Sequence, residues 1–262
     1  MNQPFEPHLS IEADGGVRLV TFNRPETLNA VDAGIHRALA RLWGHLAEDT
    51  DARAVVLTGR GRAFSAGGDM VMFQGLQEDC DERRRLLDEA ADIVRAMIAF
   101  PLPVVAAVNG PAVGLGCSVA LLCDIVYLAE SAHLCDPHVA VGLTAGDGGA
   151  ATWPLFMSLM RAKEFLLTGD RISADQALSL GLANRVIADD CLLDEALALG
   201  HRLAALPPQA VQSTKRALNM HLARATAGVL EYALAAEYQS FDTEDHREII
   251  GRFLDKRPLR NL

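Results

Sequence analysis

The chain has 262 residues, half of them hydrophobic and 22% charged, and its formal net charge at pH 7 is −10. This apolar content suffices for one large buried core. The acidic charge argues against a nucleic acid or an anionic membrane as partner, because both would be repelled. We therefore expect an enzyme-sized globular protein with a small-molecule partner.

Neither a disulfide framework nor a zinc site is indicated. The five cysteines are scattered without CxxC spacing, which favours a reducing, cytoplasmic compartment. The N-terminus lacks the basic and then apolar segments of a secretory signal. The apolar run at 104–129 contains Asn109, Pro111 and Asp124, so we expect it in a protein core and not in a membrane.

Strands and helices are expected to alternate along the first 200 residues. Short apolar runs predict strands at 17–23, 54–59, 103–110, 124–130 and 184–188, and helical periodicity predicts helices at 31–48 and 83–99. A capping box between Ser173 and Gln176 predicts a further helix at 174–180. This alternation is typical of an α/β protein with a largely parallel sheet.

After Pro207 and Pro208 the pattern becomes almost continuously helical, from Gln209 to Leu254. A helical segment of this length cannot bury its apolar residues against itself, so it must pack on the core or on another subunit. We predict an α/β core at 1–206 that carries the site and a helical oligomerisation region at 207–262.

Two short basic runs occur at 82–87 and 255–260. Runs of this length usually form solvated helix faces. We expect them to concern small anionic ligands at most.

Two glycine-rich segments, 60–70 and 109–120, each follow a predicted strand. Glycine lets backbone N–H groups approach a ligand, and a helix N-terminus favours negative charge. Ordinary tight turns remain the alternative. Neither segment contains the phosphate-binding motifs GxGxxG or GK[ST], and the hydrolase motif GxSxG is absent. Two N–H donors from separate loops would form an oxyanion hole, which indicates carbonyl chemistry.

Six segments in one order resemble the crotonase superfamily, also called the enoyl-CoA hydratase/isomerase family. They are NRPETLNA (23–30), RAFSAGGDM (62–70), VNGPAVGLGCSVALLCDI (108–125), GLTAGDGG (142–149), TGDRISADQALSLGLANRV (168–186) and FLDKRPL (253–259). The resemblance implies a spiral of repeated ββα units with a C-terminal helical trimerisation region. It also implies acyl-CoA thioester substrates and a homotrimer or a dimer of trimers.

The resemblance also implies roles for particular residues. The N–H groups of Ala66 and Leu115 would hold the thioester oxygen. The coenzyme A site would comprise Glu26, Leu28, Gly67, Gly68, Asp69, Met70 and Gly114, with Phe253 and Lys256 from the tail. Coenzyme A enters as part of the substrate, and we expect no separate cofactor and no metal.

The chain departs from the family pattern at the two catalytic glutamates, which are replaced by Ser118 and His138. Hydration needs a base for water and an acid for the α-carbon, and serine cannot replace a carboxylate base. Histidine can serve as a base, and Asp147 is the candidate to orient it through its far ring nitrogen. The β-diketone hydrolases typified by 6-oxocamphor hydrolase are similar here, with a proline–histidine step followed by a GDG turn.

Structural alternatives stay open for these residues. Asp147 would equally cap a helix that begins near Gly148, and Asp136 is interpreted as a solvated turn residue. Ser118 is a better candidate for a small space-filling residue than for a nucleophile. Trp153, Phe156 and Met157 have the spacing of core residues.

Three functions follow. The first is an acyl-CoA enzyme that isomerises, hydrates or hydrolyses its substrate, with Ser118, His138 and Asp147 as the candidate catalytic residues. The second is a C–C hydrolase of a β-diketone with a His138–Asp147 dyad. The third is a non-catalytic acyl-CoA-binding trimer. The acyl group is not readable, since one methylene is worth only about 1–3 kcal/mol of discrimination.

Overall fold

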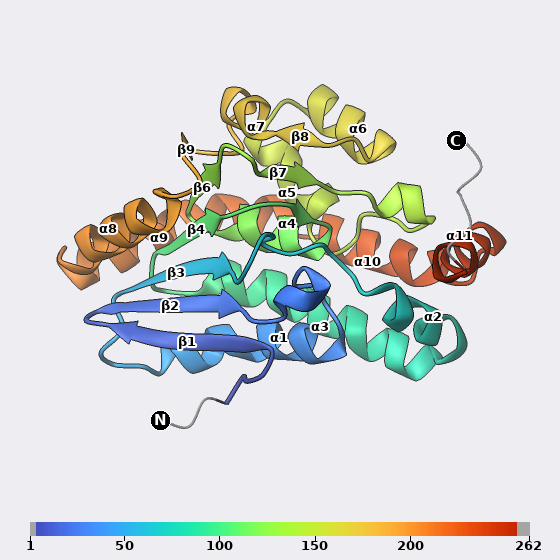
Figure 1. Cartoon of the computed structure of the whole chain (residues 1–262), viewed down its shortest axis with the longest axis horizontal. Helices are drawn as coiled ribbons and strands as arrows, with labels where there is room; N and C mark the ends of the chain where they lie inside the picture. The colour runs from blue at the N-terminus through green and yellow to red at the C-terminus, as the bar shows by residue number, and fades with distance from the viewer. Residues whose placement is uncertain (1–3, 256–262) are drawn as a thin grey trace.

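The computed structural model describes residues 4–255, which form a mixed α/β structure around a six-stranded sheet (Figure 1). The strands in spatial order are β1 (Leu9–Asp14), β2 (Val17–Phe22), β3 (Ala54–Gly59), β4 (Val104–Val108), β6 (Ile125–Ala129) and β9 (Arg185–Ile187). All neighbouring pairs are parallel except β1 and β2. The largely parallel sheet predicted from the sequence is therefore confirmed, with one added antiparallel edge strand.

A second, small sheet contains β5 (Ala112–Val113), β7 (His133–Cys135) and β8 (Ile172–Ser173). Strand β7 pairs parallel to β5 and antiparallel to β8. Strands β5, β7 and β8 have two or three residues each and were not predicted, because so short a segment shows little periodicity. This sheet sets the path of the chain from β7 into the segment that carries His138.

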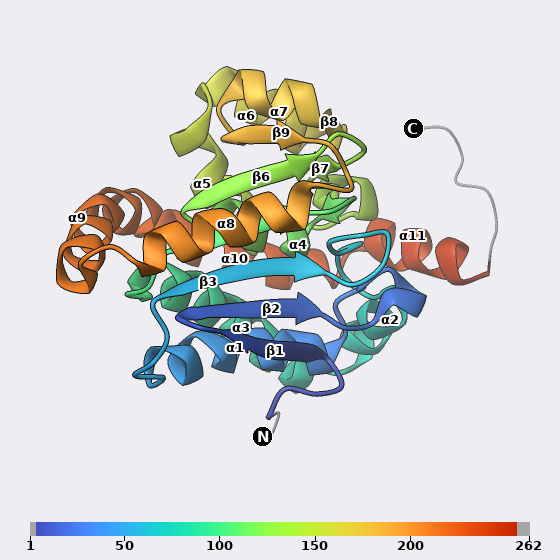
Figure 2. The same ribbon diagram turned by 60° about the vertical axis from the view of Figure 1, so that its left-hand side comes forward.

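Several helices precede residue 205, and some of them pack on the large sheet. They are α1 (Ala33–Ala47), α2 (Met70–Glu78), α3 (Cys80–Ala99), α4 (Leu115–Leu122), α5 (Gly149–Phe156), α6 (Leu159–Thr168), α7 (Ala174–Leu180) and α8 (Leu192–Ala204), with 3₁₀ turns η1 (Pro25–Thr27) and η2 (His138–Val141). Helix α8 crosses in front of β3 and β4 in Figure 2, while α1 and α3 lie side by side behind the sheet. The predicted capping box of α7 is present.

The sequence explains why α1 forms and which face it buries. The Asp32 carboxylate accepts the N–H of Ile35 at 2.8 Å and so caps the first turn. Leu39, Leu42 and Trp43 follow on the same face and are buried. Each such large side chain contributes roughly 1.5–3 kcal/mol on burial, so this face anchors α1 to the core.

The C-terminal region is helical as predicted, but it is divided into α9 (Pro208–Thr226), α10 (Val229–Ser240) and α11 (Glu244–Leu254). Gly228 has a φ of +80°, which ends α9 and redirects the chain. Helix α10 packs against α3 and α5, and α11 packs against α2. The tail therefore returns across the core and reaches the segments that form the site.

The basic run at 82–87 does not form a wholly solvated face. Arg83 is 2% exposed, and its guanidinium donates to the Leu76 carbonyl at 2.8 Å and pairs with Asp242 at 2.9 Å. Helical periodicity places Arg83 on the same side of α3 as Leu87 and Ala90, so the prediction is wrong for this residue. Most of the second run, 255–260, lies outside the described residues. Within 4–255, no helix is long and apolar enough to cross a membrane.

Candidate active site

A cavity of about 60 Å³ gathers most of the predicted site residues. Its lining includes Ala66, Gly67, Gly68, Met70, Gly114, Leu115, His138 and Asp147, all of which the sequence indicated, together with His36 and Glu237, which it did not. The other walls are mostly apolar and come from α2 and α3. Residues far apart in the sequence thus converge on one mostly apolar pocket with a few polar groups, as small-molecule sites usually have.

The two glycine-rich loops lie against each other at this cavity. The Val113 N–H donates to the Ser65 carbonyl at 2.9 Å, and the Ser65 hydroxyl donates to the Asn29 carbonyl at 2.8 Å. Gly67 has a φ of +85°, and a Cβ there would lie 2.9 Å from the Val113 carbonyl oxygen. Glycine is therefore required for the close approach of the loops.

The two N–H groups predicted to form the oxyanion hole differ in whether they already have an acceptor in this structure. Leu115 is the first residue of α4, whose N-cap Gly114 provides no side-chain cap, so the Leu115 N–H has no acceptor within its helix. The positive end of the helix dipole adds to its attraction for a developing oxyanion. The Ala66 N–H, by contrast, donates to the Leu28 carbonyl at 3.0 Å. Ala66 would have to exchange or share that acceptor to bind a substrate oxygen.

His138 lies between three acidic side chains. Its Nδ1 is in direct contact with Asp136 Oδ1, whereas its Nε2 lies 3.4 Å from Asp147 Oδ2 and 4.0 Å from Glu237 Oε1. The interpretation of Asp136 as solvated is wrong, since it is 1% exposed. A Cβ on Gly149 would overlap Asp136 Oδ2, so the absence of a side chain at Gly149 makes room for this carboxylate. Asp136, and not Asp147, therefore holds the far ring nitrogen.

Asp147 is fixed by a hydrogen bond and not by a helix. The Ser118 hydroxyl donates to Asp147 Oδ1 at 3.0 Å. Helix α5 begins at Gly149 with Gly148 as its N-cap and without a side-chain cap, so the helix-capping alternative for Asp147 is wrong. Ser118 thus orients the Asp147 carboxylate through its hydroxyl group.

Glu237 on α10 is the acidic residue that sequence reasoning missed. It is 4% exposed, and its Oε2 has no hydrogen-bond partner among the described residues. A Cβ on Gly146 would overlap this oxygen. A signal was present, because Glu237 continues the helical stripe of Leu230, Ala233 and Leu234 and so had to face the interior.

The surroundings shift the pKa values of these groups in different directions. Burial alone would lower the pKa of His138, but Asp136 and Asp147 raise it well above its usual value. Burial raises the pKa of Glu237 to about 8, and the two aspartates contribute. Burial opposes the shift of Asp147, yet the imidazolium beside it lowers that pKa. At neutral pH the site holds an imidazolium, an ionised Asp147 and a protonated Glu237. A histidine in this state is a poor base.

Asp136, His138 and Asp147 offer donor atoms that lie within 4.8 Å of one another, which is compatible with a metal site. The contact between His138 Nδ1 and Asp136, however, leaves no space for a cation between these two groups. The imidazolium already supplies the positive charge that the two aspartates require. The arrangement is therefore accounted for as an ion-paired proton site.

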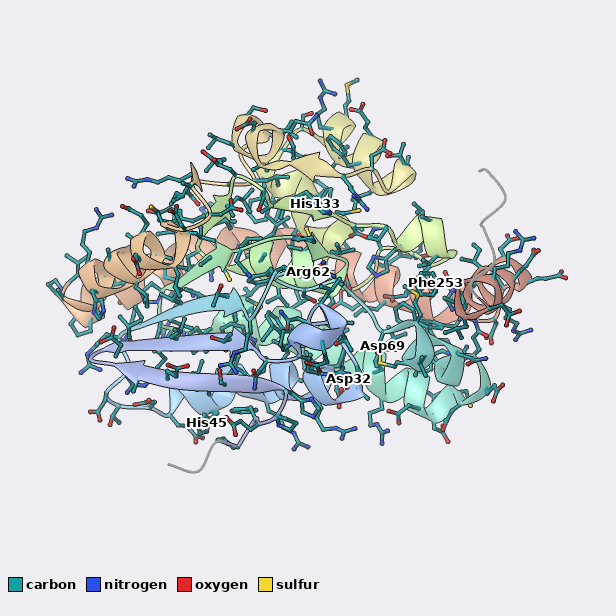
Figure 3. All side chains as sticks on the ribbon, viewed as in Figure 1. Asp32, His45, Arg62, Asp69, His133 and Phe253 are labelled. Atoms are coloured by element: carbon teal, nitrogen blue, oxygen red, sulfur yellow. The ribbon has the colours of Figure 1, made fainter. Side chains whose placement is uncertain are left out.

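The remaining predicted coenzyme A residues lie outside the cavity lining. The Asp69 carboxylate caps α2 by accepting the Val71 N–H at 2.9 Å. Phe253 is 55% exposed on α11, which packs beside α2. Asp69 and Phe253 are both labelled in Figure 3. Glu26 and Leu28 belong to the turn at η1. Lys256 lies outside the described residues.

The fold and the pocket define a crotonase-type acyl-CoA enzyme, and comparisons with known proteins agree. The enoyl-CoA hydratase/isomerase family profile matches residues 12–260, so the chain belongs to this family. It is 31% identical to the short-chain-enoyl-CoA hydratase of Clostridium acetobutylicum over 96% of both chains. It is 35% identical to the 2,3-dehydroadipyl-CoA hydratase of Escherichia coli, over 92% of this chain and 93% of that one.

A solved structure extends the agreement to the fold. The structure of an enoyl-CoA hydratase/isomerase from Mycobacterium paratuberculosis superposes with a TM-score of 0.92 at 53% identity. It covers 96% of this chain and 100% of its own. The crotonase fold predicted from the sequence is confirmed.

Proposed function

We propose that this enzyme hydrates an α,β-unsaturated acyl-CoA thioester, or catalyses the reverse reaction, with Asp147 as base and Glu237 as acid. One observation carries the proposal. Two carboxyl groups from different elements approach the same imidazole nitrogen, and their pKa values are shifted in opposite directions. Two neighbouring titratable groups whose pKa values are shifted in opposite directions are a candidate acid–base pair.

The geometry suits the two proton transfers. The thioester oxygen accepts the Leu115 N–H at the start of α4, with Ala66 as second donor once it leaves Leu28. The Asp147 carboxylate takes a proton from water as the water oxygen bonds to the β-carbon, and the protonated Glu237 gives its proton to the α-carbon. The product is a 3-hydroxyacyl-CoA.

His138 resets the site after each turnover. The reaction leaves Asp147 protonated and Glu237 ionised. His138 Nε2 lies 3.4 Å from one carboxylate and 4.0 Å from the other, so the imidazolium gives its proton to Glu237 and regains one from Asp147. Asp136 keeps the ring in place through Nδ1. His138 is thus a proton relay in this proposal.

Hydration of but-2-enoyl-CoA by Asp147→Asn and Glu237→Gln variants tests these roles. We expect kcat to fall by roughly 10²–10⁴ in each, as for the loss of a general acid or base. In the parent enzyme, kcat/KM should fall as pH rises above about 8, where Glu237 loses its proton. Ser118→Ala is the matched control: it removes only the hydrogen bond to Asp147 and should cost much less. Near-normal turnover in either carboxyl variant would refute the assignment.

A C–C hydrolase of a β-diketone is the second candidate. Pro137, His138 and the GDG turn at 146–148 keep the spacing of that group of enzymes, and a protonated Glu237 is able to neutralise the carbanion that C–C cleavage releases. Assaying a cyclic β-diketone beside the enoyl-CoA separates the two. Cleavage of the diketone without hydration would replace our proposal. Coenzyme A binding without either reaction would instead indicate a non-catalytic acyl-CoA-binding protein.

A further inference from the structure

A second histidine faces the same cavity and has no part in the proton transfers above. His36 on α1 is 3% exposed and lines the pocket. Its Nδ1 lies 3.0 Å from Glu89 Oε2 on α3. The two helices pack against each other, so the ring is held by rigid elements.

Glu89 fixes the direction of the ring. Burial opposes ionisation of Glu89, but His36 and Arg37 together lower its pKa, so it is a carboxylate at neutral pH. Its Oε1 lies 3.5 Å from Arg37 Nε, which leaves Oε2 for His36. Nδ1 must therefore carry a hydrogen toward Glu89, and Nε2 is the atom left for the cavity.

The cavity that His36 lines has mostly apolar walls. They include Val31, Phe73, Leu86, Leu87 and Ala90. Asp147 also lines it, close enough for the charge of His36 to contribute to lowering the pKa of that carboxyl group. Among residues 4–255 no group hydrogen-bonds His36 Nε2, and this atom is not fully buried, so it is open to the cavity that the residue lines. An alkyl chain in this pocket would leave the nitrogen desolvated and unpaired, which costs binding energy.

We propose that His36 Nε2 binds an oxygen of the acyl group beyond the thioester, so that the preferred substrate is a hydroxy- or oxo-substituted acyl-CoA and not a plain alkyl one. This inference rests on the proposed acyl-CoA function. A neutral imidazole accepts a hydrogen bond from a hydroxyl group, whereas an imidazolium donates to a ketone. The shared requirement is one oxygen at a fixed place along the acyl chain.

Calorimetric titration with saturated thioesters tests the preference without any turnover. Hexanoyl-CoA is compared with its 4-, 5- and 6-hydroxy and its 4- and 5-oxo derivatives. We expect at least one derivative to bind roughly 10–100 times more tightly than hexanoyl-CoA, the range expected for one hydrogen bond in a buried site. The hydroxy and oxo series show which oxygen the site accepts.

The variant His36→Phe should bind hexanoyl-CoA and the preferred derivative equally well. Because this change leaves Glu89 without its histidine, the double variant His36→Phe/Glu89→Gln serves if the single variant does not fold. Leu87→Met is the matched control, since it alters the same wall without a polar atom and should keep the preference.

Two outcomes would overturn the inference: a parent enzyme that binds every thioester alike, or a preference that survives in the folded double variant. Failure of the proposed function gives a different result. In that case but-2-enoyl-CoA is not hydrated, whereas the binding preference for an oxygenated thioester is still measured.

Discussion

The burial of Glu237, which raises the pKa of its carboxyl group, lowers the stability of the fold toward neutral pH. Its pKa in the folded protein is about 8, against 4.5 in an unfolded chain, so the unfolded state binds fewer protons between these values. The contribution of Glu237 to the free energy of unfolding therefore falls as pH rises from about 4.5 to 8. A buried acid is retained here at a cost that increases toward neutral pH.

The variant Glu237→Gln should consequently be more stable than the parent at pH 7.5, by about 1–3 kcal/mol, and gain little at pH 4.5. Urea unfolding at both pH values measures this difference. The same variant is expected to be inactive, which separates the stabilising effect from the catalytic one. An equal gain at both pH values would mean that titration of Glu237 is not its cause.

Leu115 allows the oxyanion donor to be removed by itself. Proline is tolerated at the first position of a helix, where the N–H has no helical partner. Leu115→Pro should keep α4 while kcat for hydration falls by roughly 10²–10³, the effect of losing one oxyanion donor. Leu115→Ala trims the side chain but keeps the N–H, so it should stay far more active. If both variants have the same kcat, the donor has been assigned wrongly.

The sequence was informative about some site residues and less so about others for a physical reason. His138 and Asp147 were found because they replace or accompany recognisable motif positions. Asp136 lies only two residues before His138, but charged residues are ordinarily exposed, and its burial depends on the absence of a side chain at Gly149. Glu237 lies on the buried stripe of α10, but the sequence does not show that this stripe faces His138.

At the scale of elements, Arg83 joins α3 to the C-terminal helices. Its guanidinium pairs with Asp242 and lies 5.0 Å from the centre of the Tyr238 ring. Arg83→Met should lower the free energy of unfolding by about 1–3 kcal/mol, because carbonyl groups at Leu76 and Gln77 lose their buried donor. Urea denaturation measures this loss. Arg84→Met, on the exposed side of α3, should change stability by less than about 0.5 kcal/mol.

Element prediction succeeded for most of the segments with a clear apolar pattern, although β1 and α8 were not predicted. The strands β2, β3 and β4 and the helices α1 and α3 are each at least five residues long with buried apolar faces, which gives a clear period. The short strands β5, β7 and β8 gave no such signal. The breaks between α9, α10 and α11 were missed because the apolar spacing continues through them, while the reversal depends on tertiary packing.

At the scale of the whole molecule, an apolar groove of about 590 Å³ remains open beside α9. Leu206 and Leu218 in its lining are 46% and 64% exposed. We predict that a second copy covers this surface in a homotrimer or a dimer of trimers, as the family resemblance implies. Light scattering on the purified protein gives the number of chains. Leu218→Asp should shift the mass toward the monomer, whereas Asp190→Asn, at an exposed site, should not.

The buried position of Glu237 requires glycine at 146, because any side chain there would displace the Oε2 atom of Glu237. These two positions therefore form a sequence signature, with one residue in the loop before α5 and the other in helix α10. Under the proposed mechanism, related chains with histidine at 138, glycine at 146 and glutamate at 237 are expected to use the same acid. A related chain with a larger residue at 146 is expected to place its acid elsewhere.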